Sequence, residues 1–118
     1  MFDPKDFFTL GSKLQSPIAD EACLRTSISR YYYSAFLVYR EHLSNCGHYV
    51  QKRNGEDHQG VITTLGQLGE RLSRDHLDSL RQARSKADYQ LHYKANDKDV
   101  KAAKIIAELL LKHYTDIK

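Results

Sequence analysis

Apolar positions recur at helical spacing over most of this 118-residue chain. In the longest stretch, from Ile18 to Leu43, they return every three or four residues and so fall on one face of a long helix. Ser16-Pro17 is a start signal for this helix, and Gly47 is a residue that can end it. The pattern predicts one long amphipathic helix in the first half of the chain.

Shorter helices are predicted around the long one. Asp3-Pro4 begins a first helix, while Asp57 and Asp75 are placed to cap a third, with its stripe running to Leu72, and a fourth. After a polar break, Val100 to Tyr114 forms a last apolar stripe. No segment alternates with the period of a strand. We therefore expect a single all-α domain over residues 1–118, an antiparallel up-and-down bundle of four to five helices.

The segment from His48 to Glu56 is polar and basic, and Asn54-Gly55 is a turn signal. It offers only Tyr49 and Val50 for burial. We expect an exposed loop that is mobile without a partner. The glycines of the next helix, Gly60 among them, are expected to permit close approach of helices.

The overall charge and the cysteines narrow the function classes. There are 18 Lys and Arg against 15 Asp and Glu, a net charge of +3 that permits an RNA or nucleotide partner but lacks the strong basic stripe of a duplex-DNA binder. No apolar run approaches membrane-spanning length and the start does not resemble a signal peptide, so we expect a cytoplasmic protein. Cys23 and Cys46 lack metal-site spacing, and no two histidines stand three or four residues apart. We expect two free thiols, no metal and no cofactor.

Three adjacent tyrosines follow Arg30 in the long helix. Consecutive helical residues are about 100° apart, so Tyr31, Tyr32 and Tyr33 cannot all face one core. At least one ring lies at an edge, a cleft or an interface. It is either a large core residue with a hydrated hydroxyl or part of a stacking surface beside Arg30.

A second group of polar residues surrounds Arg84. Asp88 stands four residues later, so the two can pair on one helix face, and an exposed pair of this kind contributes under about 1 kcal/mol. Arg84 also lies on the apolar stripe of its helix, where a guanidinium is costly unless it is paired or serves a site. Neighbours add a cation, a group that titrates near neutrality and a ring: Lys86, His92 and Tyr93. These groups suit phosphate binding and proton transfer.

Together these motifs resemble a family. The Arg30 to Phe36 stretch, the His58-x-Gly-Val-Ile helix start and Arg84-x-x-x-Asp88-Tyr89 are similar to a HEPN domain, in the small prokaryotic stand-alone branch with an R-x-x-x-D-Y signature. The resemblance covers roughly residues 18 to 114. It implies a helical bundle that commonly dimerises. Many HEPN domains are metal-independent ribonucleases of toxin or antiviral defence systems, and others partner small nucleotidyltransferases in toxin-antitoxin-type pairs.

The resemblance also implies roles for individual residues. As catalytic residues, Arg84 would hold the scissile phosphate and His92 or Tyr89 would transfer the proton, with the ribose 2′-hydroxyl as nucleophile and a cyclic phosphate as product. RNA or nucleotide binding would involve Arg84, Lys86, Asp88, Arg30, Tyr32 and His58. A homodimer would bring two copies of the segment from Arg84 to His92 into one cleft.

The sequence departs from the ribonuclease pattern at its histidine. Tyr89 stands where the catalytic histidine is expected, and seven residues separate Arg84 from His92. The alternative function is therefore a non-catalytic HEPN partner subunit that binds a nucleotide or docks a nucleotidyltransferase. A purely structural assembly subunit is a third hypothesis. Under either HEPN hypothesis we expect Arg84 to serve the site and to contribute little to the stability of the fold.

Overall fold

The computed structural model describes residues 1–15 and 20–118, and within them it contains five α-helices, one 3-10 turn and no strand. The elements are α1 (Lys5–Lys13), α2 (Glu21–Asn45), α3 (Glu56–Gln67), α4 (Arg71–Tyr89), α5 (Asp97–His113) and η1 (Tyr114–Asp116). The all-α helical bundle predicted from the sequence is confirmed.

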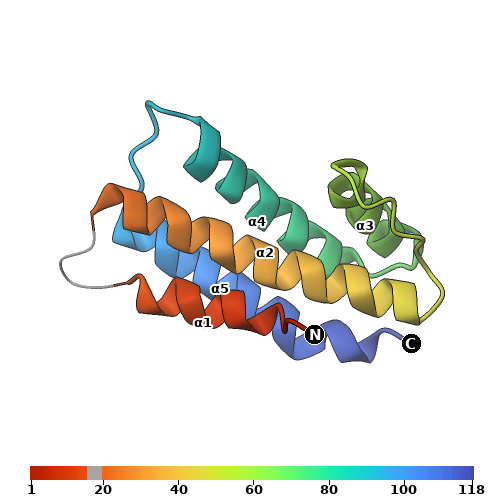
Figure 1. The fold of residues 1–118 in the computed structure, drawn as a ribbon. Helices are drawn as coiled ribbons and strands as arrows, with labels where there is room; N and C mark the ends of the chain where they lie inside the picture. Colours follow the sequence, from red (N-terminus) through yellow and green to blue (C-terminus); the bar gives the residue numbers. More distant parts are fainter. Residues whose placement is uncertain (16–19) are drawn as a thin grey trace.

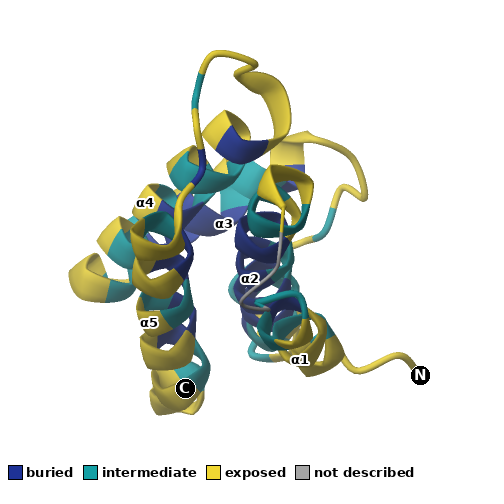
Figure 2. Cartoon of the chain, turned by 90° about the vertical axis from the view of Figure 1, so that its left-hand side faces the viewer, coloured by how far each residue is buried: buried dark blue, intermediate teal, exposed yellow. Residues whose placement is uncertain are grey.

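Helices α1, α2, α4 and α5 alternate in direction and form an up-and-down bundle, while the short α3 lies at the end where α2 finishes (Figure 1). The long helix α2 packs against every other α-helix, including α3. The buried residues of α2, α4 and α5 face one another across the bundle (Figure 2). Helix α2 is therefore the central element on which the others are placed.

The core is built from the predicted apolar stripes. Helix α2 contributes Ile28, Ala35 and Leu43, each fully buried, and α4 contributes Leu77 and Leu80. Burying a side chain of the size of leucine or isoleucine stabilises the fold by roughly 1.5–3 kcal/mol relative to exposure. Three buried tyrosines, Tyr31, Tyr32 and Tyr39, also satisfy their hydroxyls, and that of Tyr39 donates to the carbonyl of Leu110 at 2.8 Å. Burial raises the pKa of Tyr39 to about 12.

The ends of the first two helices follow local sequence signals. The backbone N–H of Lys5 donates to Asp3 Oδ1 at 2.9 Å, as the predicted start of α1 requires. Helix α2 is capped by Asp20, whose carboxylate accepts from the N–H of Cys23 at 2.9 Å. The predicted start at residues 16–17 lies outside the described residues. Helix α2 ends at Asn45, and Gly47 follows with a φ of +79°, which confirms its predicted role in ending the helix.

Two predicted caps are wrong. Helix α3 begins at Glu56, before Asp57, and α4 begins at Arg71, so Asp75 lies inside it. Asp75 pairs instead with Arg74 at 3.0 Å. Leu72, predicted to lie on the stripe of the third helix, belongs to α4 and is 70% exposed. An aspartate before an apolar run is a permissive signal, and here the chain turns earlier at Gly69, which has a φ of +79°.

Asp57 organises the loop that precedes it. Its buried carboxylate accepts hydrogen bonds from the N–H groups of Lys52 and Arg53, at 2.8 and 2.9 Å, and from Tyr49 Oη at 2.5 Å. The close approach at Gly60 is to this loop and not to another helix, because a Cβ there would lie 2.5 Å from Tyr49 Oη. The loop is thus anchored at its centre, and we replace the expectation of a mobile loop with that of an ordered one.

The C-terminal end of α4 is fastened to α2 by Arg25. Its Nη1 donates to the carbonyls of Ala87 and Gln90 at 2.9 and 3.1 Å, and its Nη2 donates to the carbonyl of Tyr93. Ala87 lies in the last turn of α4, where a carbonyl has no partner inside the helix, so the guanidinium supplies one. Gln90 and Tyr93 follow the helix, and the carbonyl of Gln90 also accepts from the N–H of Tyr93 at 3.2 Å. The contact fixes the last turn of α4, on which Asp88 and Tyr89 stand.

Candidate functional site

Arg84 lies on the face of α4 that packs against α2. Its guanidinium carbon is 5.1 Å from the ring centre of Tyr33, 5.3 Å from that of Tyr89 and 5.9 Å from that of Tyr32. Only 14% of the side chain is exposed. Because the rings shield the cation from water, its attraction for an anion is stronger than that of a fully hydrated arginine.

Three polar partners orient this guanidinium. Nε is 2.9 Å from Asp88 Oδ2, which confirms the predicted pair, and Nη2 donates to Tyr33 Oη at 2.6 Å and more weakly to Tyr89 Oη at 3.4 Å. Among the described residues, Nη1 of Arg84 has no hydrogen-bond partner. The side chain is therefore held in place while donors on Nη1 remain for a ligand.

Asp88 links this site to Arg30 on α2. Asp88 Oδ2 accepts a hydrogen bond of 3.3 Å from Ser29 Oγ. Ser29 Oγ in turn accepts a hydrogen bond of 3.2 Å from Arg30 Nη2. The guanidinium of Arg30 lies over the rings of Phe7 and Tyr33, 4.9 and 5.2 Å from their centres. Two arginines thus share the ring of Tyr33, and the Asp88 carboxylate pairs with Arg84 and is connected to Arg30 through Ser29 Oγ.

Tyr32 and His58 form the buried side of the site. Tyr32 Oη is 2.5 Å from His58 Nδ1, and the imidazole stacks on Phe36 with ring centres 4.3 Å apart. Burial raises the pKa of Tyr32 above its usual value. Burial lowers the pKa of His58 below 6.5, and the nearby cations of Arg81 and Arg84 lower it further. Both groups are therefore neutral at pH 7.

The three adjacent tyrosines of α2 lie in three different surroundings. Tyr31 and Tyr32 are fully buried, and Tyr33 stands half-buried at the edge of the bundle, where it holds Arg84. Tyr31 fills the space beside α1, where Ser12 Oγ lies 3.1 Å from its hydroxyl. One tyrosine therefore belongs to the candidate site, one to the core against α1, and Tyr32 to both the core and the site.

The structure gathers most of the residues singled out around Arg84 and in the long helix, while His92, Lys86 and Tyr93 lie apart. Together in one network are Arg84, Asp88, Tyr89, Arg30, Tyr32 and His58. His92 lies exposed in the turn after α4, and no hydrogen bond or ion pair joins it to another described residue. Lys86 is exposed and lines a different hollow, together with Tyr93.

Sequence reasoning missed three members of the network: Ser29, Tyr33 and Phe36. A helical signal was present, because Ser29 and Tyr33 stand four residues apart and Phe36 follows three residues later on the same face. Tyr33 and Ser29 contact Arg84 and Asp88 on α4, which lie more than fifty residues further along the chain. No local sequence pattern predicts contacts over that separation.

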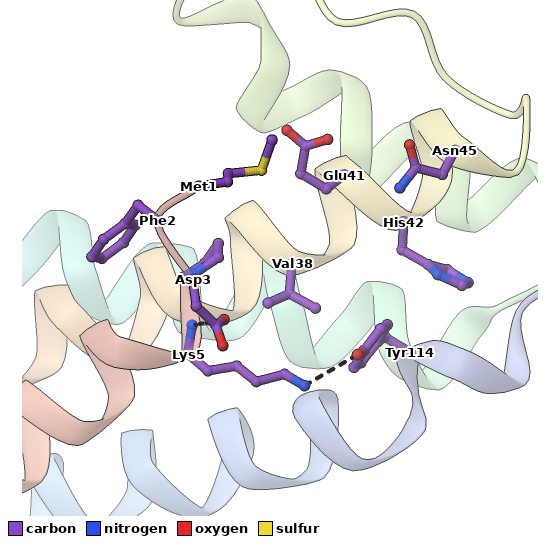
Figure 3. A pocket seen from close by; sticks show the side chains of 10 residues that line it. Met1, Phe2, Asp3, Lys5, Val38, Glu41, His42, Asn45 and Tyr114 are labelled. Carbon is purple, nitrogen blue, oxygen red and sulfur yellow. Dashed lines mark hydrogen bonds between the residues drawn. The ribbon is translucent and has the colours of Figure 1, made fainter.

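Another hollow lies away from this network. It has a volume of about 470 Å³ between the N-terminal tail, α2 and Tyr114, and Lys5 Nζ donates to Tyr114 Oη at 3.2 Å across it (Figure 3). Glu41 and His42 approach it from α2. One wall is the exposed start of the chain, Met1 and Phe2, so the hollow depends on how the tail lies.

Comparisons with known proteins leave the family open: no family model, no curated protein and no solved structure matches the chain. Within residues 1–15 and 20–118, no three His, Cys, Asp or Glu side chains are grouped closely enough to hold a metal ion. None of the described helices has the length and apolar character needed to cross a membrane.

Proposed function

We propose that this chain is a HEPN-type protein that binds RNA or a nucleotide in the cytoplasm, as part of a prokaryotic defence or toxin-antitoxin-type system. The observation that carries the proposal is Arg84: a guanidinium held by Asp88 and Tyr33, shielded by three tyrosine rings, with donors left free. A planar, pre-oriented guanidinium binds a phosphate through paired hydrogen bonds, and the tyrosines add surfaces on which bases stack.

The position of His92 favours binding over cleavage. A proton-transfer group must reach the reacting oxygen directly or through one water, and His92 lies in an exposed turn outside the network. The non-catalytic form, a nucleotide-binding subunit or one that docks a nucleotidyltransferase, is therefore the version we prefer.

Metal-independent endoribonuclease activity is the second candidate, and Tyr89 is the observation in its favour. Its hydroxyl lies within 3.4 Å of Arg84 Nη2, so both could meet one phosphate. In that reaction the ribose 2′-oxygen attacks phosphorus and loses its proton, while the 5′-oxygen leaves and gains one. The products are a 2′,3′-cyclic phosphate and a 5′-hydroxyl.

A homodimer belongs to this proposal. The long helix carries so many apolar and aromatic residues that its sequence also suggested a surplus apolar surface for a second copy. The apolar stripe of α2 is buried inside the chain. Exposed apolar side chains stand instead on α4 and α5: Leu72, Ile105 and Leu109. Light scattering at micromolar concentration is expected to give twice the chain mass, and a monomer mass would contradict the dimer.

One binding experiment tests the function. A fluorescent single-stranded RNA is titrated with the protein in EDTA, with anisotropy as the readout, and the RNA is then run on a gel to detect cleavage. Arg84→Lys keeps the charge but loses the planar donors, so we expect roughly tenfold weaker binding. Arg71→Lys, at an exposed position on the same helix, is the matched control. Equal binding by all three proteins would refute the assignment of Arg84.

A further inference from the structure

An open hollow of about 500 Å³ adjoins the Arg84 site and shares the ring of Tyr33 with it. Tyr33, Phe36 and His58 form its aromatic part, with the His58 ring stacked on Phe36 and set edge-on to Tyr33 at 5.9 Å. The loop before α3 forms another side of the hollow with Gln51 and Asn54. The His58 ring presents a flat surface on which another aromatic ring can stack, and Tyr33 stands edge-on beside it.

The orientation of the Gln51 amide is fixed by its neighbours. Ser44 Oγ donates its one proton to the carbonyl of Arg40 at 2.7 Å, so it can only accept from Gln51 Nε2, which lies 3.2 Å away. The amide nitrogen of Gln51 must therefore face Ser44. Its Oε1 accepts no hydrogen bond from another described residue, which leaves one acceptor available to the hollow.

In Asn54 it is the amide oxygen, and not the nitrogen, that is held by a neighbour. Its Oδ1 accepts from the backbone N–H of Glu56 at 2.9 Å, so its Nδ2 points away from that contact. Among the described residues, Nδ2 of Asn54 has no hydrogen-bond partner. The rim of the hollow thus offers one amide donor from Asn54 and one amide acceptor from Gln51, and every nucleobase carries an acceptor next to a donor on its pairing edge.

Charged side chains complete the rim. The guanidinium of Arg40 lies 5.6 Å from the ring centre of Phe36 and pairs with Asp57 at 3.4 Å, and Arg53 follows in the loop that Asp57 anchors. These cations suit the phosphate that flanks a bound base. The hollow also contains one carboxylate, Glu41, which can accept from a sugar hydroxyl or an amino group and would oppose a phosphate placed beside it.

We propose that this hollow is a subsite for one unstacked base of single-stranded RNA, next to the phosphate site at Arg84. The inference rests on the proposed function and adds the substrate class: a strand with bases, and not the sugar-phosphate chain alone. The base stacks on the His58 ring, beside the edge-on ring of Tyr33, and its edge meets Asn54 and Gln51. Asp57 is a positioning residue, because it holds the loop that carries these two amides.

The test compares RNA strands that differ only in their bases. Short homopolymers of A, C, G and U and an abasic strand of equal length are titrated by anisotropy. We expect at least one homopolymer to bind roughly tenfold more tightly than the abasic strand, as stacking of one base provides. Asn54→Asp keeps the oxygen that accepts from Glu56 and replaces the free donor by an acceptor, so the ranking of the four bases should change by roughly fivefold.

Gln67→Glu is the control, because it adds the same charge at the exposed C-terminal end of α3. It should leave the ranking of the bases unchanged. Equal binding of base-bearing and abasic strands, with dependence on Arg84, would overturn the subsite and leave the proposed function standing. A base preference that Asn54→Asp does not alter would also overturn it, since the base would then bind elsewhere. No RNA binding by the unaltered protein would overturn the proposed function itself, and the subsite with it.

Discussion

The hydroxyl of Tyr33 accepts a 2.6 Å hydrogen bond from Nη2 of Arg84, a residue 51 positions further along the chain. This contact joins the two sequence segments that looked unusual for separate reasons, the tyrosine run of α2 and the charged end of α4. It also explains how a guanidinium is accommodated on the apolar stripe of α4, because the Asp88 carboxylate balances its charge at 2.9 Å and Tyr33 accepts a hydrogen bond from Nη2.

We expect Arg84 to contribute to stability as well as to the candidate site. The sequence suggested a hydrated side chain whose loss would leave the fold unchanged, but it is 14% exposed and paired. We expect Arg84→Ala to lower the free energy of unfolding by about 1–3 kcal/mol, since Asp88 and Tyr33 lose their partner. Urea denaturation measures this, and a larger loss of stability combined with full RNA binding would mark the pair as structural.

Arg25 is expected to be a stability residue without a role in binding. Arg25→Met removes the donor to the carbonyls of Ala87, Gln90 and Tyr93, so the free energy of unfolding should fall by about 2–3 kcal/mol. The exposed Arg71→Met is the control and should change it by less than about 0.5 kcal/mol. Equal melting curves for the two variants would show that the Arg25 contacts do not fasten α4.

The loop before α3 should be ordered at its centre. Hydrogen exchange is expected to be slow at the amides of Lys52 and Arg53, because both donate to the buried carboxylate of Asp57. Asp57→Ala should make both exchange rapidly and destabilise the protein by about 2–4 kcal/mol, since four donors, that of Arg40 included, lose their acceptor. Rapid exchange at both amides in the unaltered protein would instead support the mobile loop expected from composition.

His58 should make stability depend on pH. Its folded pKa is lowered by burial and by Arg81 and Arg84, so the unfolded chain binds more protons as pH falls below 6.5. The contribution of His58 is complete above that pH and is lost as pH falls through the folded pKa. Asp57 acts separately: burial opposes its ionisation, but hydrogen bonds from Tyr49 and the Lys52 and Arg53 amides lower its pKa below 3.8.

Melting temperature measured from pH 7.5 to pH 5 tests the histidine. The melting temperature of the His58→Gln variant should fall less steeply over this pH range than that of the unaltered protein. An NMR titration of the His58 ring should give a pKa below 6.5. A value above 6.5 would mean that the imidazole gains a proton on folding, and the neutral stacking surface would be lost.

The fold could be predicted because helical periodicity is a local property of the sequence. The stripe of α2, its end before Gly47 and the break between Tyr89 and Asp97 all appear in the structure as expected. Helix starts were less certain, because Asp57 and Asp75 are as suitable for caps as the residues that precede them. Asp57 instead accepts hydrogen bonds from the loop that precedes it, and one of these depends on where the fold places Tyr49.

The candidate site could be predicted only in part, because spacing along one helix is a local property and packing between two helices is not. Arg84, Asp88 and Tyr89 share one helix end, so their proximity follows from spacing. His92 is close in sequence, yet it lies beyond the end of α4 at Tyr89 and stands exposed in the turn. Tyr33 and Ser29 join the network only because α2 and α4 pack against each other.

The central claim, that RNA or a nucleotide binds at Arg84, is tested most directly by NMR during titration with a short single-stranded RNA. We predict that the largest shift changes fall on the Arg84 Nε–H signal and on the ring signals of Tyr33 and Tyr89. The exposed Arg71 on the same helix should remain unchanged. Saturable binding that shifts signals at the N-terminal tail and Tyr114, with Arg84 and Tyr33 unmoved, would contradict the account.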